Sequence, residues 1–176
     1  ISFSAENTIT TDTDYVNSVY VADIDGDGHM DVLSASGADD TIAWYKNDGQ
    51  SNPGFSAQKI IATDADYATS VYAADLDGDG DMDVLSASFS DDKIAWYENN
   101  GAADPTFTAH TISTSADGAM AVYAADIDGD GDMDVLSASF SDNKIAWYEN
   151  DGSELFTTHT ITTSASYARG VYAADL

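Results

Sequence analysis

The chain has 176 residues, of which 32 are acidic and 5 basic, giving a formal net charge of −27, and it contains no cysteine. This charge disfavours nucleic acid, whose binding depends on Lys and Arg at the phosphates, and the lack of cysteine excludes disulfides and thiolate metal sites. Hydrophobic residues make up 43% of the chain, enough for a packed core, so the acidity does not indicate disorder. No apolar run approaches the roughly 18 residues of a membrane span, and we expect no membrane insertion.

An internal repeat of about 51 residues organises the chain. Acidic loops begin at Asp23, Asp75 and Asp126, which are 52 and 51 residues apart. A tryptophan follows each of these aspartates after 21 residues, whereas the connection beyond the tryptophan varies in length. The predicted units are repeat 1 (residues 1–54), repeat 2 (55–106), repeat 3 (107–155) and the start of a truncated fourth repeat (156–176).

Each repeat contains short strand signals separated by turn residues. Around the second acidic loop, residues 70–75, 82–88, 93–99 and 107–112 are rich in Val, Ile, Tyr or Trp and are bounded by Gly, Asp, Asn or Ser. No helical period accompanies them. Four short strands at this period predict an all-β fold of tandem four-stranded β-propeller blades.

Propellers close with four to eight blades, so three repeats are expected to be open-ended or part of a larger propeller or array. The two ends of the chain also carry the same pieces, since residues 3–23 match residues 156–175. We therefore do not expect the chain to close a ring by itself.

The acidic loop of each repeat is the candidate functional site. In residues 23–31, aspartates stand at positions 1, 3, 5 and 9, and a glycine at position 6 allows the chain to turn. Ca2+ prefers about six to eight oxygen ligands, which closely spaced carboxylates and a backbone carbonyl at position 7 can supply. We predict three calcium ions, one per complete repeat. The expected ligands are Asp23, Asp25, Asp27, His29 and Asp31; Asp75, Asp77, Asp79, Asp81 and Asp83; and Asp126, Asp128, Asp130, Asp132 and Asp134.

Other interpretations of these loops fit less well. An EF-hand requires a bidentate Glu at position 12, where Ser34, Ser86 and Ser137 stand. A solvated acidic turn does not account for three copies of one pattern. Because four carboxylates and a carbonyl leave little room for an outside ligand, we expect the metal to be structural.

The sequence resembles the FG-GAP/VCBS repeat family over nearly its whole length. The resemblance rests on the loop Asp-x-Asp-Gly-Asp-Gly-x-x-Asp, on Ile-Ala-Trp-Tyr-Glu-Asn-Asp-Gly at 145–152 and on Phe-x-x-His-x-Ile at 156–161. Such repeats form blades of calcium-binding β-propellers, similar to integrin α-subunit heads, secreted bacterial repeat proteins and certain fungal lectins. The resemblance implies the same metal ligands and places Asp175 first in a fourth loop. It does not fix a function, because the blade serves adhesion, sugar binding and scaffolding alike.

We expect a non-enzymatic protein, because the near-identical carboxylates already have a use and no set of a nucleophile with a base is evident. Weak calcium modules suit the millimolar Ca2+ outside cells, so we expect a secreted or cell-surface protein of microbial origin. The first functional hypothesis is a structural or adhesion scaffold that can assemble blade to blade into fibres or rings. Its partners would be further copies of itself or the rest of a longer array, and a glycan or cell-surface ligand.

The second hypothesis is a lectin-like carbohydrate-binding propeller. Tyr15, Tyr67 and Tyr167 precede a strand in their repeats and are the preferred sugar-stacking residues, although Gly118 takes this place in the third copy. The repeated Trp-Tyr pairs are instead expected to pack between blades, at Trp44, Tyr45, Trp96, Tyr97, Trp147 and Tyr148. His110 and His159, for which Gln58 is the expected equivalent, are predicted to make hydrogen bonds without a catalytic role.

Overall fold

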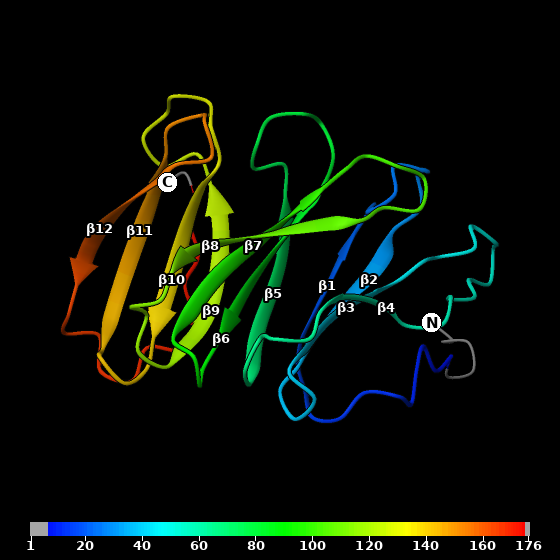
Figure 1. Cartoon of the computed structure of the whole chain (residues 1–176), viewed down its shortest axis with the longest axis horizontal. Helices are drawn as coiled ribbons and strands as arrows, with labels where there is room; N and C mark the ends of the chain where they lie inside the picture. Colours follow the sequence, from blue (N-terminus) through cyan, green and yellow to red (C-terminus); the bar gives the residue numbers. More distant parts are fainter. Residues whose placement is uncertain (1–6, 175–176) are drawn as a thin grey trace, which may run out of the picture.

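The computed structural model describes residues 7–174, which form three four-stranded antiparallel sheets (Figure 1). The first sheet contains β1 (Val16–Ala22), β2 (Asp31–Ser36), β3 (Thr41–Tyr45) and β4 (Lys59–Ala62). The second contains β5 (Ala68–Ala74), β6 (Asp83–Ser88), β7 (Lys93–Asn99) and β8 (Phe107–Ser113). The third contains β9 (Ala119–Ala125), β10 (Asp134–Ser139), β11 (Lys144–Asn150) and β12 (Phe156–Thr162). No helix among these residues is long and apolar enough to cross a membrane.

The all-β class and the four-strand unit are confirmed, but the sheets are offset by one strand from the repeats. Strand β8 opens the predicted repeat 3 (107–155) and pairs with β7 in the second sheet, as its grouping with the strands around the second acidic loop predicts. The cause is the connection after β7, which reverses the chain so that β8 runs antiparallel to β7. Each sheet therefore takes its outer strand from the start of the next repeat.

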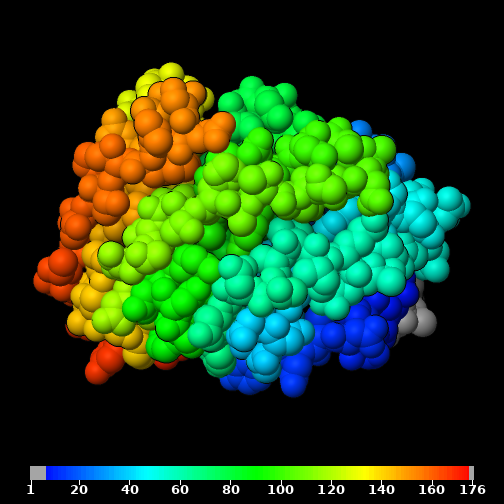
Figure 2. All heavy atoms as spheres, in the orientation of Figure 1, coloured from blue at the N-terminus to red at the C-terminus, as the bar shows by residue number. Residues whose placement is uncertain are grey.

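The sheets follow one another in space in the order of the sequence (Figure 1), with β1 beside β5 and β5 beside β9. Figure 2 shows the chain colours in the same succession across one face, from the first sheet to the third. Within residues 7–174 the three sheets form an open arc and not a closed ring. The matching end segments lie partly outside the described residues.

The core lies between adjacent sheets, where large side chains meet small ones. Leu85, Ile94 and Trp96 of the second sheet pack in one cluster with the third sheet, and Trp44 packs likewise between the first and second. Their side chains are buried, as predicted for aromatic residues between blades, whereas Trp147 is only half-buried. Most of the facing residues are small: Ala65, Ala68, Val71, Ala73, Val84 and Ala95 in or just before the second sheet, and Ala116, Ala119, Val122, Ala124, Val135 and Ala146 in or just before the third, with Tyr97 and Tyr148 as the large exceptions. This complementarity fixes the order in which sheets can stack.

A buried asparagine at the end of β7 ties the second sheet to the first. Asn99 donates from Nδ2 to the carbonyl of Ile24, in the first acidic loop, at 2.8 Å and to that of Met82 at 3.0 Å. Asn150 makes the same pair of bonds between the third and second sheets. In the first sheet the side-chain nitrogen of Asn47 donates to the carbonyl of Met30, in its own sheet, and to no other sheet within residues 7–174.

Replacing Asn99 by Ala leaves the buried carbonyl of Ile24 and the half-buried one of Met82 without this partner, and it should lower the free energy of unfolding by about 2 kcal/mol. Asn47→Ala is the matched control, because Asn47 also accepts the turn amide of Gly49 but bridges no sheets. We expect it to cost less than about 1 kcal/mol. Urea unfolding followed by circular dichroism measures both. Equal losses would show that the bridge between the sheets does not contribute.

Candidate functional site

Each acidic loop is the hairpin between the first two strands of its sheet, and it gathers three carboxylates. One oxygen from each lies within 4.8 Å of the others. The clusters are Asp23, Asp25 and Asp27; Asp75, Asp77 and Asp83; and Asp126, Asp128 and Asp134. The structure thus brings nine of the predicted ligands together, while Asp175 lies outside the described residues.

The first aspartate of the loop holds the turn in shape. Asp75 accepts hydrogen bonds from the backbone amides of Gly78 at 2.8 Å and of Gly80 at 3.1 Å. Both glycines have positive φ, +77° and +97°, a conformation that costs glycine little and other residues more. The loop therefore wraps around one carboxylate, which keeps the aspartates at alternate positions close together.

The ninth aspartate is fully buried and ties the loop to the third strand. Asp83 accepts hydrogen bonds from the amides of Leu76 at 2.9 Å and Asn99 at 2.8 Å. Asp31 and Asp134 make the same two bonds in their sheets. Burial raises the pKa of Asp83 to about 7, although both hydrogen bonds act in the opposite direction. This position is a structural clamp as well as a candidate ligand, a role that the spacing did not reveal.

The seventh position supplies no side chain to the clusters. Asp81 and Asp132 lie against Gly101 and Gly152, in the turns that follow the third strands. The ring of His29 lies in the same way against the glycine of its own sheet. The side chain of the seventh residue therefore lies outside the cluster, and its backbone carbonyl remains the predicted metal ligand. Asp79 and Asp130 instead accept the amide at the seventh position, each at 2.9 Å.

The donor set of the second and third loops fits a hard cation. All of its atoms are oxygens, the ligands that Ca2+ prefers. Burial raises the pKa of Asp77, and the charges of Asp79, Asp75 and Glu98 act in the same direction. Within residues 7–174, no Lys, Arg or His forms an ion pair with an aspartate of these two loops. A bound cation would offset this concentration of negative charge.

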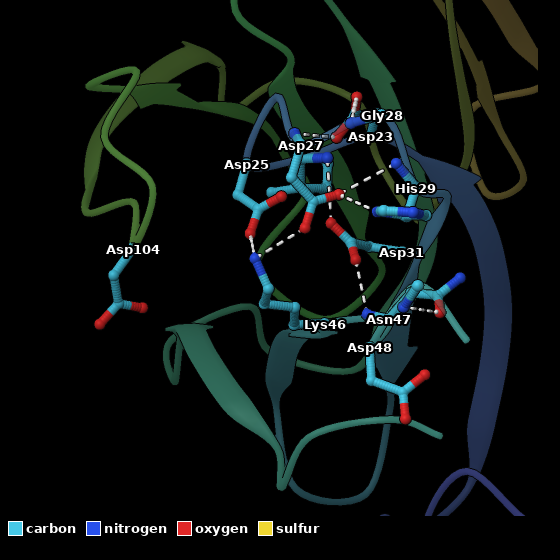
Figure 3. A network of polar contacts seen from close by, with 12 residues as sticks. Asp23, Asp25, Asp27, Gly28, His29, Asp31, Lys46, Asn47, Asp48 and Asp104 are labelled. Atoms are coloured by element: carbon cyan, nitrogen blue, oxygen red, sulfur yellow. Dashed lines mark hydrogen bonds and ion pairs between the residues drawn. The ribbon is translucent and has the colours of Figure 1, made fainter. Parts of the chain in front are cut away.

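The first loop has a positive charge of its own. Lys46 extends into it, and its ammonium pairs with Asp25 and lies 2.9 Å from Oδ2 of Asp27 (Figure 3). Its hydrogen bond to Asp27 lowers the pKa of that carboxyl to about 2. Glu98 and Glu149 occupy the corresponding place in the other two sheets. The three loops are therefore alike in backbone but not in charge.

The strand register corrects one predicted equivalence. Lys59, and not Gln58, lies opposite Trp44, as His110 lies opposite Trp96. The imidazole of His110 stacks on the indole at 4.5 Å between ring centroids, and the Lys59 ammonium lies 5.1 Å from its own indole centroid. The first sheet has one residue more between its phenylalanine and its isoleucine, which moved the alignment by one position.

Glu98 and His110 also belong to a cluster that the sequence analysis missed. Nε2 of His110 donates to Oε2 of Glu98 at 2.9 Å, and Glu154 of the third sheet brings a further carboxylate within 4.8 Å. Glu98 and His110 lie on the paired strands β7 and β8. The same pair recurs in the third sheet, where Nε2 of His159 lies 2.6 Å from Oε2 of Glu149. Glu154 is 56 positions from Glu98, and the packing of the second and third sheets brings it to this pair.

A groove lined by aromatic side chains lies away from the acidic loops. It has a volume of about 390 Å³, and its lining residues are Tyr67, Phe89, Ser90, Met120, Phe140 and Arg169. The guanidinium of Arg169 lies 4.9 Å from the ring centroid of Phe140, and the ring of Tyr167 packs against the same ring in a tilted arrangement, with 4.9 Å between centroids. The tyrosines were predicted, but the two phenylalanines were not.

The backbone explains why a glycine can replace one tyrosine. Tyr15, Tyr67 and Tyr167 have φ of 60°, 55° and 58°, and Gly118 has 65°. This left-handed conformation is uncommon for residues other than glycine, so Gly118 is the less strained residue at this position. The tyrosines are retained in a conformation that costs free energy.

Comparison with known proteins places these features in a family. The family model described as FG-GAP-like repeat matches the chain three times, over residues 23–86, 75–137 and 127–176. Comparison with the curated proteins gives no match.

Two solved structures show a similar fold. One is a lectin of Agrocybe aegerita, described as specifically recognising non-reducing terminal N-acetylglucosamine, with a TM-score of 0.59 and 23% identity over 85% of this chain. The other is Bap1, a biofilm matrix protein of V. cholerae, with a TM-score of 0.50 and 25% identity over 80% of this chain. The present chain spans 39% of the lectin chain and 20% of the Bap1 chain.

Proposed function

Because the chain belongs to the FG-GAP-like repeat family, we propose that it is a non-enzymatic extracellular scaffold built from calcium-tied propeller blades. The observation that carries this proposal is the convergence of carboxylate oxygens at the same hairpin of all three sheets. The residues that would hold the metal are the aspartates of these clusters, with the carbonyl at the seventh position. Bound calcium would neutralise the repulsion among them.

Calcium would act structurally, by fixing the hairpin to the rest of its sheet. Asp83 belongs to the carboxylate cluster and accepts the amide of Asn99 at the end of β7. Asn99 in turn bonds to the loop of the preceding sheet. An ion at one loop would therefore stiffen both its own sheet and the contact with the sheet before it.

Asp77→Ala tests the calcium assignment. It removes a carboxylate from the second cluster, so in saturating calcium its melting temperature should lie about 5 to 10 °C below that of the parent. After chelation the difference should be small, because the parent then gains nothing from the ligand. Asp117→Ala, an exposed acidic residue outside the clusters, is the control and should behave as the parent. Equal melting of Asp77→Ala and parent in saturating calcium would contradict the assignment.

One face of the first sheet is suited to receive a further blade. Val19 of β1 is 65% exposed, whereas its counterparts Val71 and Val122 are 3% and 5% exposed. Val71 belongs to the core between the first and second sheets, and Val122 to the core between the second and third. The surface around Val19 thus has the side chains that a preceding blade covers elsewhere in the molecule. A second copy of the chain supplies such a blade and would extend the stack.

Light scattering in calcium should therefore give a mass above that of the monomer. Val19→Asp should shift the protein to the monomer, because it places a charge in the contact, while leaving the thermal melt nearly unchanged. Ile161→Asp is the control: Ile161 is also exposed, but it lies on β12, the outer strand of the third sheet. A parent that stays monomeric at all concentrations would exclude assembly through this face.

The aromatic groove favours a second candidate function, carbohydrate binding. Tyr67, which lines the groove, keeps a strained backbone conformation of a kind common at functional sites, and its ring is exposed in the groove that Arg169 also lines. Aromatic rings with a few polar groups are typical of ligand sites. The lectin of similar fold makes N-acetylglucosamine the first sugar to test.

Tyr67→Gly separates the two functions. Gly118 shows that glycine fits the same backbone conformation in the third repeat, so the fold should tolerate the change. If the groove binds sugar, the variant should lose about tenfold or more in affinity on a glycan array and in titration with N-acetylglucosamine, since stacking on Tyr67 is lost. Absence of sugar binding by the parent would leave the scaffold as the function.

A further inference from the structure

The first acidic loop differs from the other two at one position outside the loop. Tyr45 pairs with Val32 as the tyrosines of β7 and β11 pair with their own valines. The residues that follow these tyrosines, Lys46, Glu98 and Glu149, are therefore structural equivalents. The first sheet has a cation where the others have an anion.

The ammonium of Lys46 lies among the carboxylates that would hold a metal. It pairs with Asp25, whose side chain is fully buried, and with Asp27 at 2.9 Å. These are two of the three aspartates in the first cluster. Figure 3 shows the lysine side chain directed into the loop between them. His29 adds a second donor, because its Nδ1 lies 2.9 Å from Oδ1 of Asp27.

We propose that Lys46 is a built-in cation that takes the place of calcium in the first loop, so that the chain binds two calcium ions tightly and a third only weakly. This inference rests on the proposed calcium-binding function. The first site has four aspartates, a lysine and a histidine, whereas each of the others has five aspartates and a glutamate. The number of charged ligands tunes calcium affinity over several orders of magnitude, and a fixed ammonium repels a divalent ion.

The ammonium of Lys46 does not satisfy every carboxylate oxygen of the first cluster. Lys46 pairs with Oδ2 of Asp25, while Oδ1 is buried and has no hydrogen-bond partner within the described part of the chain. An ion can therefore still enter the first loop when calcium is abundant. We expect the site in the first loop to bind calcium at least about tenfold more weakly than the sites in the second and third loops.

The test counts calcium ions by equilibrium dialysis and native mass spectrometry, with thermal melts to confirm folding. The parent should show two tight sites. Lys46→Glu gives the first loop the residue of the second and third repeats and should show three tight sites. Lys46→Gln should raise the calcium affinity of the first loop by a smaller amount. Glu98→Lys gives the second loop the charge of the first and should leave one tight site.

The outcomes separate this inference from the function on which it rests. Three sites of equal affinity in the parent, unchanged by Lys46→Glu, would overturn the inference and leave the calcium scaffold intact. A parent that binds no calcium would overturn both. If Glu98→Lys does not fold, the gain of a third tight site in Lys46→Glu still decides, because that variant removes a charge pair but adds a residue that the same position holds twice in this chain.

Discussion

The structure depends on one buried carboxylate in each sheet, at the ninth position of the acidic loop. Asp83 accepts one amide from the start of its loop and another from the end of the third strand. A buried charge is costly unless hydrogen bonds compensate it, so the loop, the second strand and the third strand are held in a single arrangement. The asparagine beside this contact then carries the constraint to the preceding sheet. Packing between the sheets follows from this alignment.

The carboxylates of each acidic loop repel one another, and a bound cation would offset this repulsion. Alternate aspartates on a tight turn place carboxylate oxygens within 4.8 Å of one another, and like charges at this distance repel each other. In the first sheet the ammonium of Lys46 neutralises part of this negative charge. In the second and third sheets glutamates stand at that position and add to the negative charge, which points to a cation from solution.

Much of the fold could be predicted from the repeat alone. The strand predicted at 93–99 has the observed bounds, and the second acidic loop lies between the strands predicted on either side of it. The prediction of the calcium ligands remains untested, because closeness of carboxylates does not identify an ion. The asparagine bridge to the carbonyl of Ile24 was missed because it joins residues 75 positions apart in the chain. The position of Lys59 opposite Trp44 was missed because one extra residue in the first sheet shifted the alignment of the repeats.

The sequence by itself determined the period, the strand content and the acidic loops, since each of these rests on residues close together in the chain. Hydrophobic alternation and turn glycines act locally, so strands and turns can be predicted from them without knowledge of the fold. Only the tertiary structure decided that Lys46 enters the first loop, and that Phe89 and Phe140 meet Tyr67 and Arg169 in one groove. These contacts depend on how one sheet is seated on the next, which is set by the shapes of both facing surfaces together.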